Sequence, residues 1–289
     1  MPGKSSSVDE VLLCVTKIVT FSGGQSLTNA TGFFFLKNGY LYLITARHVV
    51  ANYETGHTPD SIHVLLHSDD KNLQQQSGLS IPLYVDGISQ WWEHPTLGHD
   101  VDLVAISVNA PNVLLDHLVA TFTTHEIASI EDCLPLGQDV FIVGFPLGFH
   151  DTVNHLPIVR HATIASSFRH PFKGRPYFLT DARLHRGMSG APVIARLAQH
   201  DRSKCRRDPF WKLLGIHSSA LDVSDRDSDK DEKLALNMTW YATLLADILP
   251  ADHTAAPLDI EHSISSTQES HFMNDPPRVR YRFRTATIS

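Results

Sequence analysis

Short apolar and β-branched segments alternate with turn residues through roughly the first 220 residues of the chain. The candidate strands are Val11–Phe21, Phe33–Leu36, Tyr40–Thr45, Ile62–Leu66, Ile81–Val85, Leu103–Val108, Val140–Gly144, Pro157–Ala165, Tyr177–Thr180, Ala191–Ala195 and Lys212–His217. Two of them flank Lys37-Asn38-Gly39, and Asn-Gly is a strong signal for a β-hairpin turn. Many short strands with almost no long helical pattern between them indicate an all-β barrel or sandwich.

The chain changes character after this strand-rich part. Residues 221–233 are a charged run, and the apolar spacing of Leu234–Leu249 predicts an amphipathic helix that ends at Pro250. Residues 251–289 are rich in Ser, Thr, Asp, His and Pro, so we expect a tail. Within the tail, Arg278–Arg284 alternates Arg with apolar residues. This pattern fits an added edge strand, a disordered segment or a site for a peptide or an acidic partner.

Composition excludes several classes of protein. The chain has 289 residues, of which 42% are hydrophobic and 19% charged, so it is neither wholly disordered nor fibrous. Its length fits two domains or one two-lobed domain. The formal net charge of −7 disfavours nucleic-acid binding. No apolar run approaches the roughly 20 residues of a membrane helix, and the N-terminus lacks the apolar core of a signal peptide, so we expect a cytoplasmic protein without a membrane partner.

Cysteine and acidic residues give no metal or disulfide signal. The three cysteines are Cys14, Cys133 and Cys205. They are far apart and lack paired spacing, which fits a reducing compartment and argues against a disulfide framework or a zinc site. Asp alternates along Asp225–Asp231, but an EF-hand loop starting there would need Gly and Glu where the chain has Lys230 and Leu236. We therefore interpret this segment as a surface loop and expect no metal and no cofactor.

Three short motifs carry candidate chemistry. They are Leu43–Val50 with His48, His99–Ile106 with Asp102, and Thr180–Pro192 with Gly187 and Ser189. Each is weak alone, because a His beside a strand or a Gly-x-Ser-Gly turn more often has a structural role. Together, in the order His, Asp, Ser, they resemble the trypsin-like (chymotrypsin-fold) serine proteases. The resemblance covers about residues 10–250.

Four segments resemble HtrA-type proteases in particular. They are Ala30–Phe34, Val143–Gly148, the nucleophile segment Thr180–Gly190, and Leu213–Ser218. The chain departs from the HtrA pattern at Met188, where Asn is usual, and at Ala191, where Gly is usual. No PDZ-like segment follows the protease-like part.

The resemblance implies a double barrel with the active site in the cleft between the barrels. Residues 1–9 would be an N-terminal segment, 10–120 the first six-stranded-type β-barrel, 121–250 the second barrel with a C-terminal helix, and 251–289 the tail. Such a fold would have no cofactor, and its partner would be a protein or peptide substrate.

The triad chemistry assigns a role to each residue. A Ser hydroxyl is a poor nucleophile at neutral pH, so Ser189 needs a base, and His48 would supply it and later act as the acid. Asp102 would orient the imidazole, with Asp100 as a rival two residues earlier. The backbone N–H groups of Gly187 and Ser189 would form the oxyanion hole.

Specificity rests on three residues that would line the primary pocket: Arg183, His217 and Ser218. Gly215-Ile216-His217 resembles a strand of glutamyl endopeptidases and of viral proteases that cut after Gln, in which the His reads the substrate side chain. We therefore expect cleavage after Glu, Gln or Asp. The alternatives are an outward salt bridge for Arg183 and a structural hydrogen bond for His217.

The function expected from these features is limited intracellular proteolysis in a bacterium. Two alternatives stay open at this point. The chain could be a non-catalytic module that holds a peptide in its cleft, or an enzyme that is latent until a protein partner orders Gly187–Ser189. Met188 and Ala191 keep the second alternative open.

Overall fold

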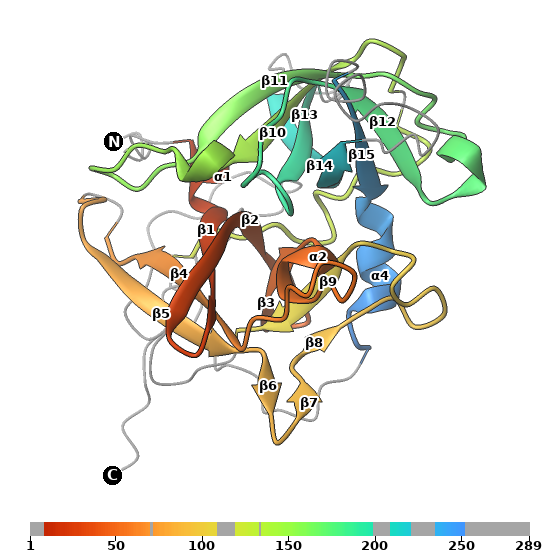
Figure 1. Cartoon of the computed structure of the whole chain (residues 1–289). Helices are drawn as coiled ribbons and strands as arrows, with labels where there is room; N and C mark the ends of the chain where they lie inside the picture. The colour runs from red at the N-terminus through yellow and green to blue at the C-terminus, as the bar shows by residue number, and fades with distance from the viewer. Residues whose placement is uncertain are drawn as a thin grey trace.

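The computed structural model of the chain describes residues 9–69, 72–108, 119–132, 134–198, 209–220 and 235–251. The elements are α1 (Glu10–Leu13), β1 (Val15–Ser22), β2 (Gln25–Lys37), β3 (Tyr40–Thr45), α2 (Arg47–Val50), β4 (Ser61–His67), β5 (Gln76–Pro82), β6 (Tyr84–Val85), β7 (Ile88–Ser89), β8 (Trp91–Trp92), β9 (Val104–Ser107), β10 (Asp139–Gly144), η1 (Pro146–Gly148), β11 (Ile158–Ile164), η2 (Phe172–Gly174), β12 (Tyr177–Asp181), β13 (Pro192–Ala198), β14 (Pro209–Ala220), β15 (Leu236–Tyr241), η3 (Ala242–Leu244) and α4 (Leu245–Ile248). The fold is therefore mostly β, as the strand pattern predicts (Figure 1).

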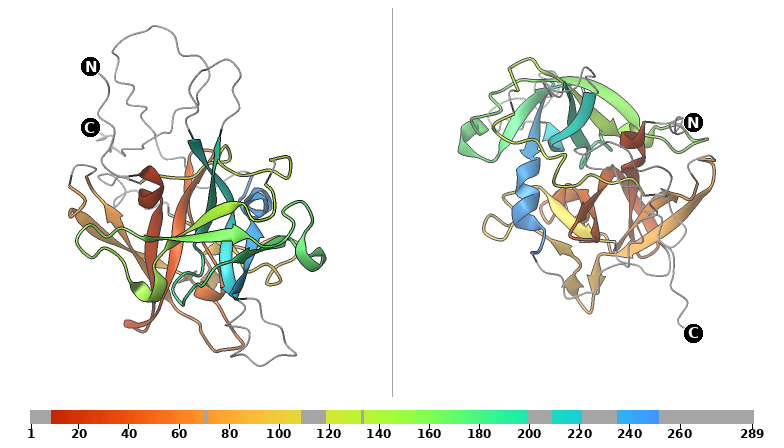
Figure 2. Two further views of the ribbon diagram at one scale, coloured as in Figure 1. Left: turned by 90° about the horizontal axis from the view of Figure 1, so that it is seen from above. Right: turned by 180° about the vertical axis from the view of Figure 1, so that it is seen from behind.

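The strands form two units. A seven-stranded antiparallel sheet has the order β5-β4-β1-β2-β3-β9-β8, and a closed barrel has the order β10-β11-β12-β15-β14-β13. The red-to-yellow strands of the sheet lie on one side of the molecule and the green-to-blue strands of the barrel on the other (Figures 1 and 2). The sequence predicts two barrels, but only the second closes, because β5 and β8 share no ladder among the described residues.

Strand β3 and the second half of β2, from Ala30 to Leu36, are buried on both faces, which explains their continuous apolar runs. Phe34, Leu41 and Leu43 pack into the core of the sheet with α2 and β4. Phe35 and Tyr42 point the other way, into a cluster that includes barrel residues of β10, β12, β13 and β14. This second cluster joins the sheet to the barrel and fixes the two units against each other.

The C-terminal segment differs from the expected helix. Leu236–Tyr241 is strand β15, which pairs with β12 and β14 and completes the barrel, and only η3 and the short α4 remain helical. Asn237 and Thr239 are buried, so they break the apolar periodicity that strands usually show. The helix α4 lies beside the sheet, where the Lys37 ammonium donates to the carbonyl oxygen of Leu249 at 2.9 Å.

Several expectations fall outside the described residues. Residues 221–234 and 252–289 are among these, and with them the charged run, the Asp225–Asp231 repeat and Arg278–Arg284. Within the described part, no helix is long and apolar enough to cross a membrane. Across the same residues, no group of His, Cys, Asp and Glu side chains is placed to hold a metal ion.

Candidate active site

The three motif residues come from both units of the fold. His48 lies on α2, directly after β3, and the buried Val49 and Val50 anchor this turn in the sheet core. Asp102 lies just before β9, the strand that pairs with β3. Ser189 lies in the loop between β12 and β13 of the barrel. The site is therefore assembled where the sheet meets the barrel.

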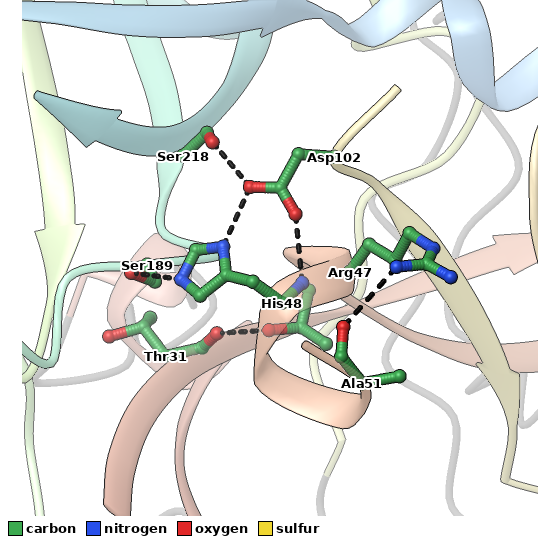
Figure 3. A network of polar contacts seen from close by, with 8 residues as sticks. Thr31, Arg47, His48, Ala51, Asp102, Ser189 and Ser218 are labelled. Carbon is green, nitrogen blue, oxygen red and sulfur yellow. Dashed lines mark hydrogen bonds and ion pairs between the residues drawn. The ribbon is translucent and has the colours of Figure 1, made fainter. Parts of the chain in front are cut away.

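The side chains of these residues form one hydrogen-bonded chain (Figure 3). Ser189 Oγ lies 2.9 Å from His48 Nε2, and His48 Nδ1 lies 2.7 Å from Asp102 Oδ2. The other Asp102 oxygen accepts the backbone N–H of His48 at 2.8 Å. Asp102 therefore fixes both the ring and the main chain of His48.

The rival acid Asp100 is engaged elsewhere. Its carboxylate lies 3.3 Å from Nη2 of Arg175, which also donates to the Asp100 carbonyl oxygen at 3.0 Å. This pair is exposed and links the barrel to the segment before Asp102. The geometry therefore selects Asp102 and not Asp100 as the partner of His48.

The electrostatics of the pair favour a charged carboxylate beside an imidazole with enhanced basicity. Burial lowers the pKa of His48, but the hydrogen bond and the charge of Asp102 raise it, and the net pKa lies above its ordinary value. Burial raises the pKa of Asp102, but hydrogen bonds and the charge of His48 lower it overall. Because Asp102 accepts from Nδ1, the neutral ring leaves Nε2 free to accept the Ser189 proton.

Every carbonyl of the nucleophile loop, residues 186–189, is held by a donor. Arg186 O accepts from Leu147 N at 2.6 Å, Gly187 O from Thr31 Oγ1 at 2.7 Å, Met188 O from Ala191 N at 2.9 Å, and Ser189 O from Thr31 N at 3.0 Å. The N–H groups of Gly187 and Ser189 have no acceptor among the described residues. Two unpaired donors beside Ser189 are what an oxyanion hole requires.

Gly187 is needed where it stands. Its φ is +93°, and a Cβ there would lie 2.4 Å from the carbonyl oxygen of Phe145. The departures from the HtrA pattern, Met188 and Ala191, are fully buried and belong to the barrel core. Their side chains therefore anchor the nucleophile loop in the barrel core.

The three predicted pocket residues have different surroundings. His217, on β14, is 4% exposed, and its Nδ1 is enclosed without a hydrogen-bond partner among the described residues. Burial lowers its pKa to about 3. Arg183 is exposed, forms no ion pair within the described part of the chain, and its carbonyl oxygen accepts from Arg160 Nη2 at 2.7 Å.

Ser218 has a side-chain role that the sequence did not indicate. It was expected to line the primary pocket, and its hydroxyl donates to Oδ2 of Asp102, the same oxygen that faces His48 (Figure 3). Because Ser218 is 1% exposed, its side chain supports the carboxylate, and a contact of this residue with substrate stays a prediction. Sequence reasoning also missed Thr31, although its Ala-Thr-Gly-Phe segment was among the resemblances.

One comparison with known proteins identifies the family of the chain. The family described as the trypsin-like peptidase domain matches residues 30–199, which is more than half of the chain. The chain therefore belongs to the trypsin-like peptidase family. Among curated proteins, no sequence matches it.

Three solved structures are distantly similar to the chain. The active form of the Rv3671c protease of Mycobacterium tuberculosis is 15% identical with a TM-score of 0.44, over 84% of this chain and 84% of that one. Its inactive form gives 15% and 0.46 over 83% and 90%. A serine endoprotease from Yersinia pestis gives 14% and 0.47, over 84% of this chain and 65% of that one. These values are too low to carry an argument about function.

Proposed function

We propose that this protein is a serine endopeptidase that hydrolyses peptide bonds through an acyl-enzyme. The observation that carries the proposal is the continuous chain from Ser189 Oγ through His48 to Asp102, at 2.9 and 2.7 Å, next to two unpaired N–H groups. The order of residues and their geometry match the roles that acyl transfer requires.

Acylation uses His48 first as a base and then as an acid. Ser189 Oγ attacks the carbonyl carbon of the scissile bond while its proton passes to His48 Nε2. The negative charge that develops on the carbonyl oxygen is stabilised by the N–H groups of Gly187 and Ser189. His48 then protonates the leaving amine as the C–N bond breaks, and the acyl group stays on Ser189.

Deacylation repeats these steps with water. His48, neutral again, accepts a proton from a water molecule, which attacks the acyl ester. Collapse of the second tetrahedral intermediate releases the carboxylic acid and returns the proton to Ser189. Asp102 stays ionised throughout and stabilises the imidazolium each time it forms.

The proposed specificity is cleavage after Glu, Gln or Asp, with His217 as the reader. The His217 ring is buried, and its Nδ1 is enclosed without a partner among the described residues, so a substrate cannot reach this nitrogen. The other ring nitrogen, Nε2, is not enclosed in this way, so it is the nitrogen that can form a hydrogen bond with a substrate side chain. With a pKa of about 3, the ring is neutral at pH 5 to 8 and would read by hydrogen bonding, not by charge.

The test of the activity is labelling with a fluorophosphonate, read as intact mass. The Ser189 oxygen displaces fluoride from phosphorus, so the wild type should gain one adduct and Ser189→Ala none. His48→Ala is the matched control, because it keeps the hydroxyl and lacks the base, and we expect no adduct on the labelling timescale.

Three outcomes would contradict the proposal in different ways. Equal labelling of the wild type and Ser189→Ala would mean that another residue reacts. No adduct on folded wild type would favour the peptide-binding module or a latent enzyme, and activity that appears only with an added partner protein would identify the latter. A peptide library cleaved only after small apolar residues would overturn the proposed specificity alone.

A further inference from the structure

Thr31 connects the two units of the fold at the site through three hydrogen bonds, and a fourth holds it within the sheet. It lies on β2 of the sheet and is fully buried, close to the Ser189–His48 pair (Figure 3). Its hydroxyl donates to the Gly187 carbonyl oxygen at 2.7 Å and accepts from the Phe145 N–H at 3.0 Å. Its own N–H donates to Ser189 O at 3.0 Å, and its carbonyl oxygen accepts from Thr45 Oγ1 at 2.8 Å.

The position of Thr31 matters because the reacting groups are divided between the units. His48 and Asp102 belong to the sheet, whereas Ser189 and the oxyanion donors belong to the barrel. A Thr31 hydroxyl on the sheet side holds a carbonyl of the barrel loop, so it aligns the two halves of the site directly. The apolar cluster between the units holds them together without fixing the orientation of a peptide group.

Peptide planarity connects this contact to the oxyanion hole. The Arg186–Gly187 peptide carries the Gly187 N–H at one end and the Arg186 carbonyl at the other, so holding the carbonyl aims the N–H. Leu147 N holds that carbonyl at 2.6 Å. Leu147 lies two residues after Phe145, whose N–H is bound by the Thr31 hydroxyl. The same hydroxyl fixes the next peptide of the loop through the Gly187 carbonyl.

We propose that the Thr31 hydroxyl is a positioning group that holds the Gly187 N–H in its oxyanion-binding orientation. This inference rests on the proposed peptidase function, since an oxyanion forms only during acyl transfer. Thr31 touches no reacting atom, and it acts through the nucleophile loop and through the Phe145–Leu147 turn. It therefore serves the transition state and not the binding of substrate.

The test compares two substitutions of Thr31 that differ in the hydroxyl. Thr31→Val keeps the volume and removes both hydrogen bonds, whereas Thr31→Ser keeps the hydroxyl. We expect Thr31→Val to slow fluorophosphonate labelling and to lower kcat by about 10- to 100-fold, less than the loss of an oxyanion donor itself. KM should change by less than about threefold, because the lost interaction acts in the transition state. Thr31→Ser should restore most of the rate.

Thr20→Val is the matched control for a buried hydroxyl. Thr20 lies on β1, is fully buried, and its hydroxyl accepts the backbone N–H of Thr28 at 3.0 Å, away from the site. It should lower the melting temperature as Thr31→Val does and leave kcat near the wild-type value. An equal loss of kcat in Thr20→Val would assign the effect to general destabilisation and overturn the inference.

The remaining outcomes are also decisive. A Thr31→Val enzyme with wild-type kcat, or a Thr31→Ser enzyme as slow as Thr31→Val, overturns the inference while the proposed function stands. If Thr31→Val and Thr31→Ala both fail to fold at the assay temperature, the hydroxyl is a folding determinant and the inference is wrong. A wild type that does not react with the fluorophosphonate overturns the proposed function and, with it, this inference.

Discussion

His48 and His217 are residues of the same type whose pKa values are shifted in opposite directions in two neighbouring regions of the site. At His48, burial lowers the pKa, but the hydrogen bond and charge of Asp102 outweigh it, so the net pKa is raised. At His217, burial dominates and lowers the pKa to about 3, and no hydrogen bond to either ring nitrogen comes from the described residues. The difference is that the Asp102 carboxylate is hydrogen-bonded to the His48 ring, whereas its charge acts on His217 without a hydrogen bond and is outweighed by burial.

The comparison extends to the surroundings of the two residues. On the catalytic side, the four carbonyls of residues 186–189 and both Asp102 oxygens have donors before any substrate arrives. On the recognition side, the His217 ring is buried and its polar groups are unsatisfied. The catalytic region is thus complete in the free protein, whereas at His217 a substrate side chain would supply a hydrogen-bond partner for Nε2.

Removing the charge of Asp102 should have the largest effect on kcat, because this charge is what distinguishes His48 from His217. In Asp102→Asn the amide can offer N–H to Nδ1, which places the ring proton on Nε2, where it cannot accept from Ser189. We expect kcat to fall by about 10⁴-fold, with the fold intact. The measurement is steady-state kinetics on a peptide substrate at neutral pH.

Asp100→Asn is the control for this substitution. Asp100 is exposed and pairs with Arg175, so its variant should keep kcat within about threefold of the wild type, given the small contribution of exposed ion pairs. A comparable loss in both variants would show that the carboxylates act through the local backbone and not through His48.

The sequence predicts the catalytic region far better than the recognition region, for a physical reason. Acyl transfer demands particular residue types, so His48, Asp102 and Ser189 can be found from their identity and order, and the structure brings them together. A positioning hydroxyl has no such signature. Thr31 and Ser218 are common residue types whose role depends on which atoms the fold places beside them.

The secondary structure follows the same logic. The hairpin at Asn38 was predictable because its turn chemistry is local: Asn38 has φ of +52° and Lys37 pairs with Tyr40. Strand β15 was not, because its inward face carries Asn237, whose amide donates to the Ala182 carbonyl oxygen at 2.7 Å. A buried polar residue satisfied by a distant backbone group disturbs the apolar periodicity on which such predictions depend.

Replacing His217 should remove the proposed preference for Glu, Gln or Asp before the scissile bond. His217→Leu fills a similar volume and removes the hydrogen-bonding groups. We expect kcat/KM for substrates with Glu, Gln or Asp before the scissile bond to fall by about 10- to 100-fold, the value of one or two buried hydrogen bonds. Substrates with a small apolar residue there should be cleaved as before or faster.

Arg183→Ala separates the two candidate readers of the substrate. Because Arg183 is exposed, its removal should change the same ratio by less than about threefold. If Arg183→Ala no longer cleaves the acidic substrates and His217→Leu still cleaves them, the charge of Arg183 and not a buried imidazole determines the specificity.

The pH dependence of kcat tests the opposite pKa shifts directly. Activity requires neutral His48, so kcat should rise with pH through an apparent pKa above 6.5 and fall about tenfold per pH unit below it. His217 stays neutral down to pH 5 because its pKa is about 3, so it should add no second step. The His217→Leu profile should therefore have the same shape, and a step near pH 6 that disappears in this variant would contradict the assignment.

A smaller loss of kcat than that of Asp102→Asn belongs to Ser218, whose hydroxyl donates to the Asp102 oxygen that also faces His48. Its hydroxyl lowers the pKa of Asp102, so Ser218→Ala leaves a more basic carboxylate beside the imidazole. We expect kcat to fall by about three- to tenfold, since one hydrogen bond to a charged group is lost while the His48 contact remains. The apparent pKa of kcat should move slightly upward.

The control is Ser166→Ala, which removes a hydroxyl that accepts the Leu179 N–H at 2.8 Å in the barrel. It should change neither kcat nor its apparent pKa. A Ser218→Ala loss as large as that of Asp102→Asn would mean that Ser218 sets the geometry of the acid, and the division between a complete catalytic region and its outer support would have to be redrawn.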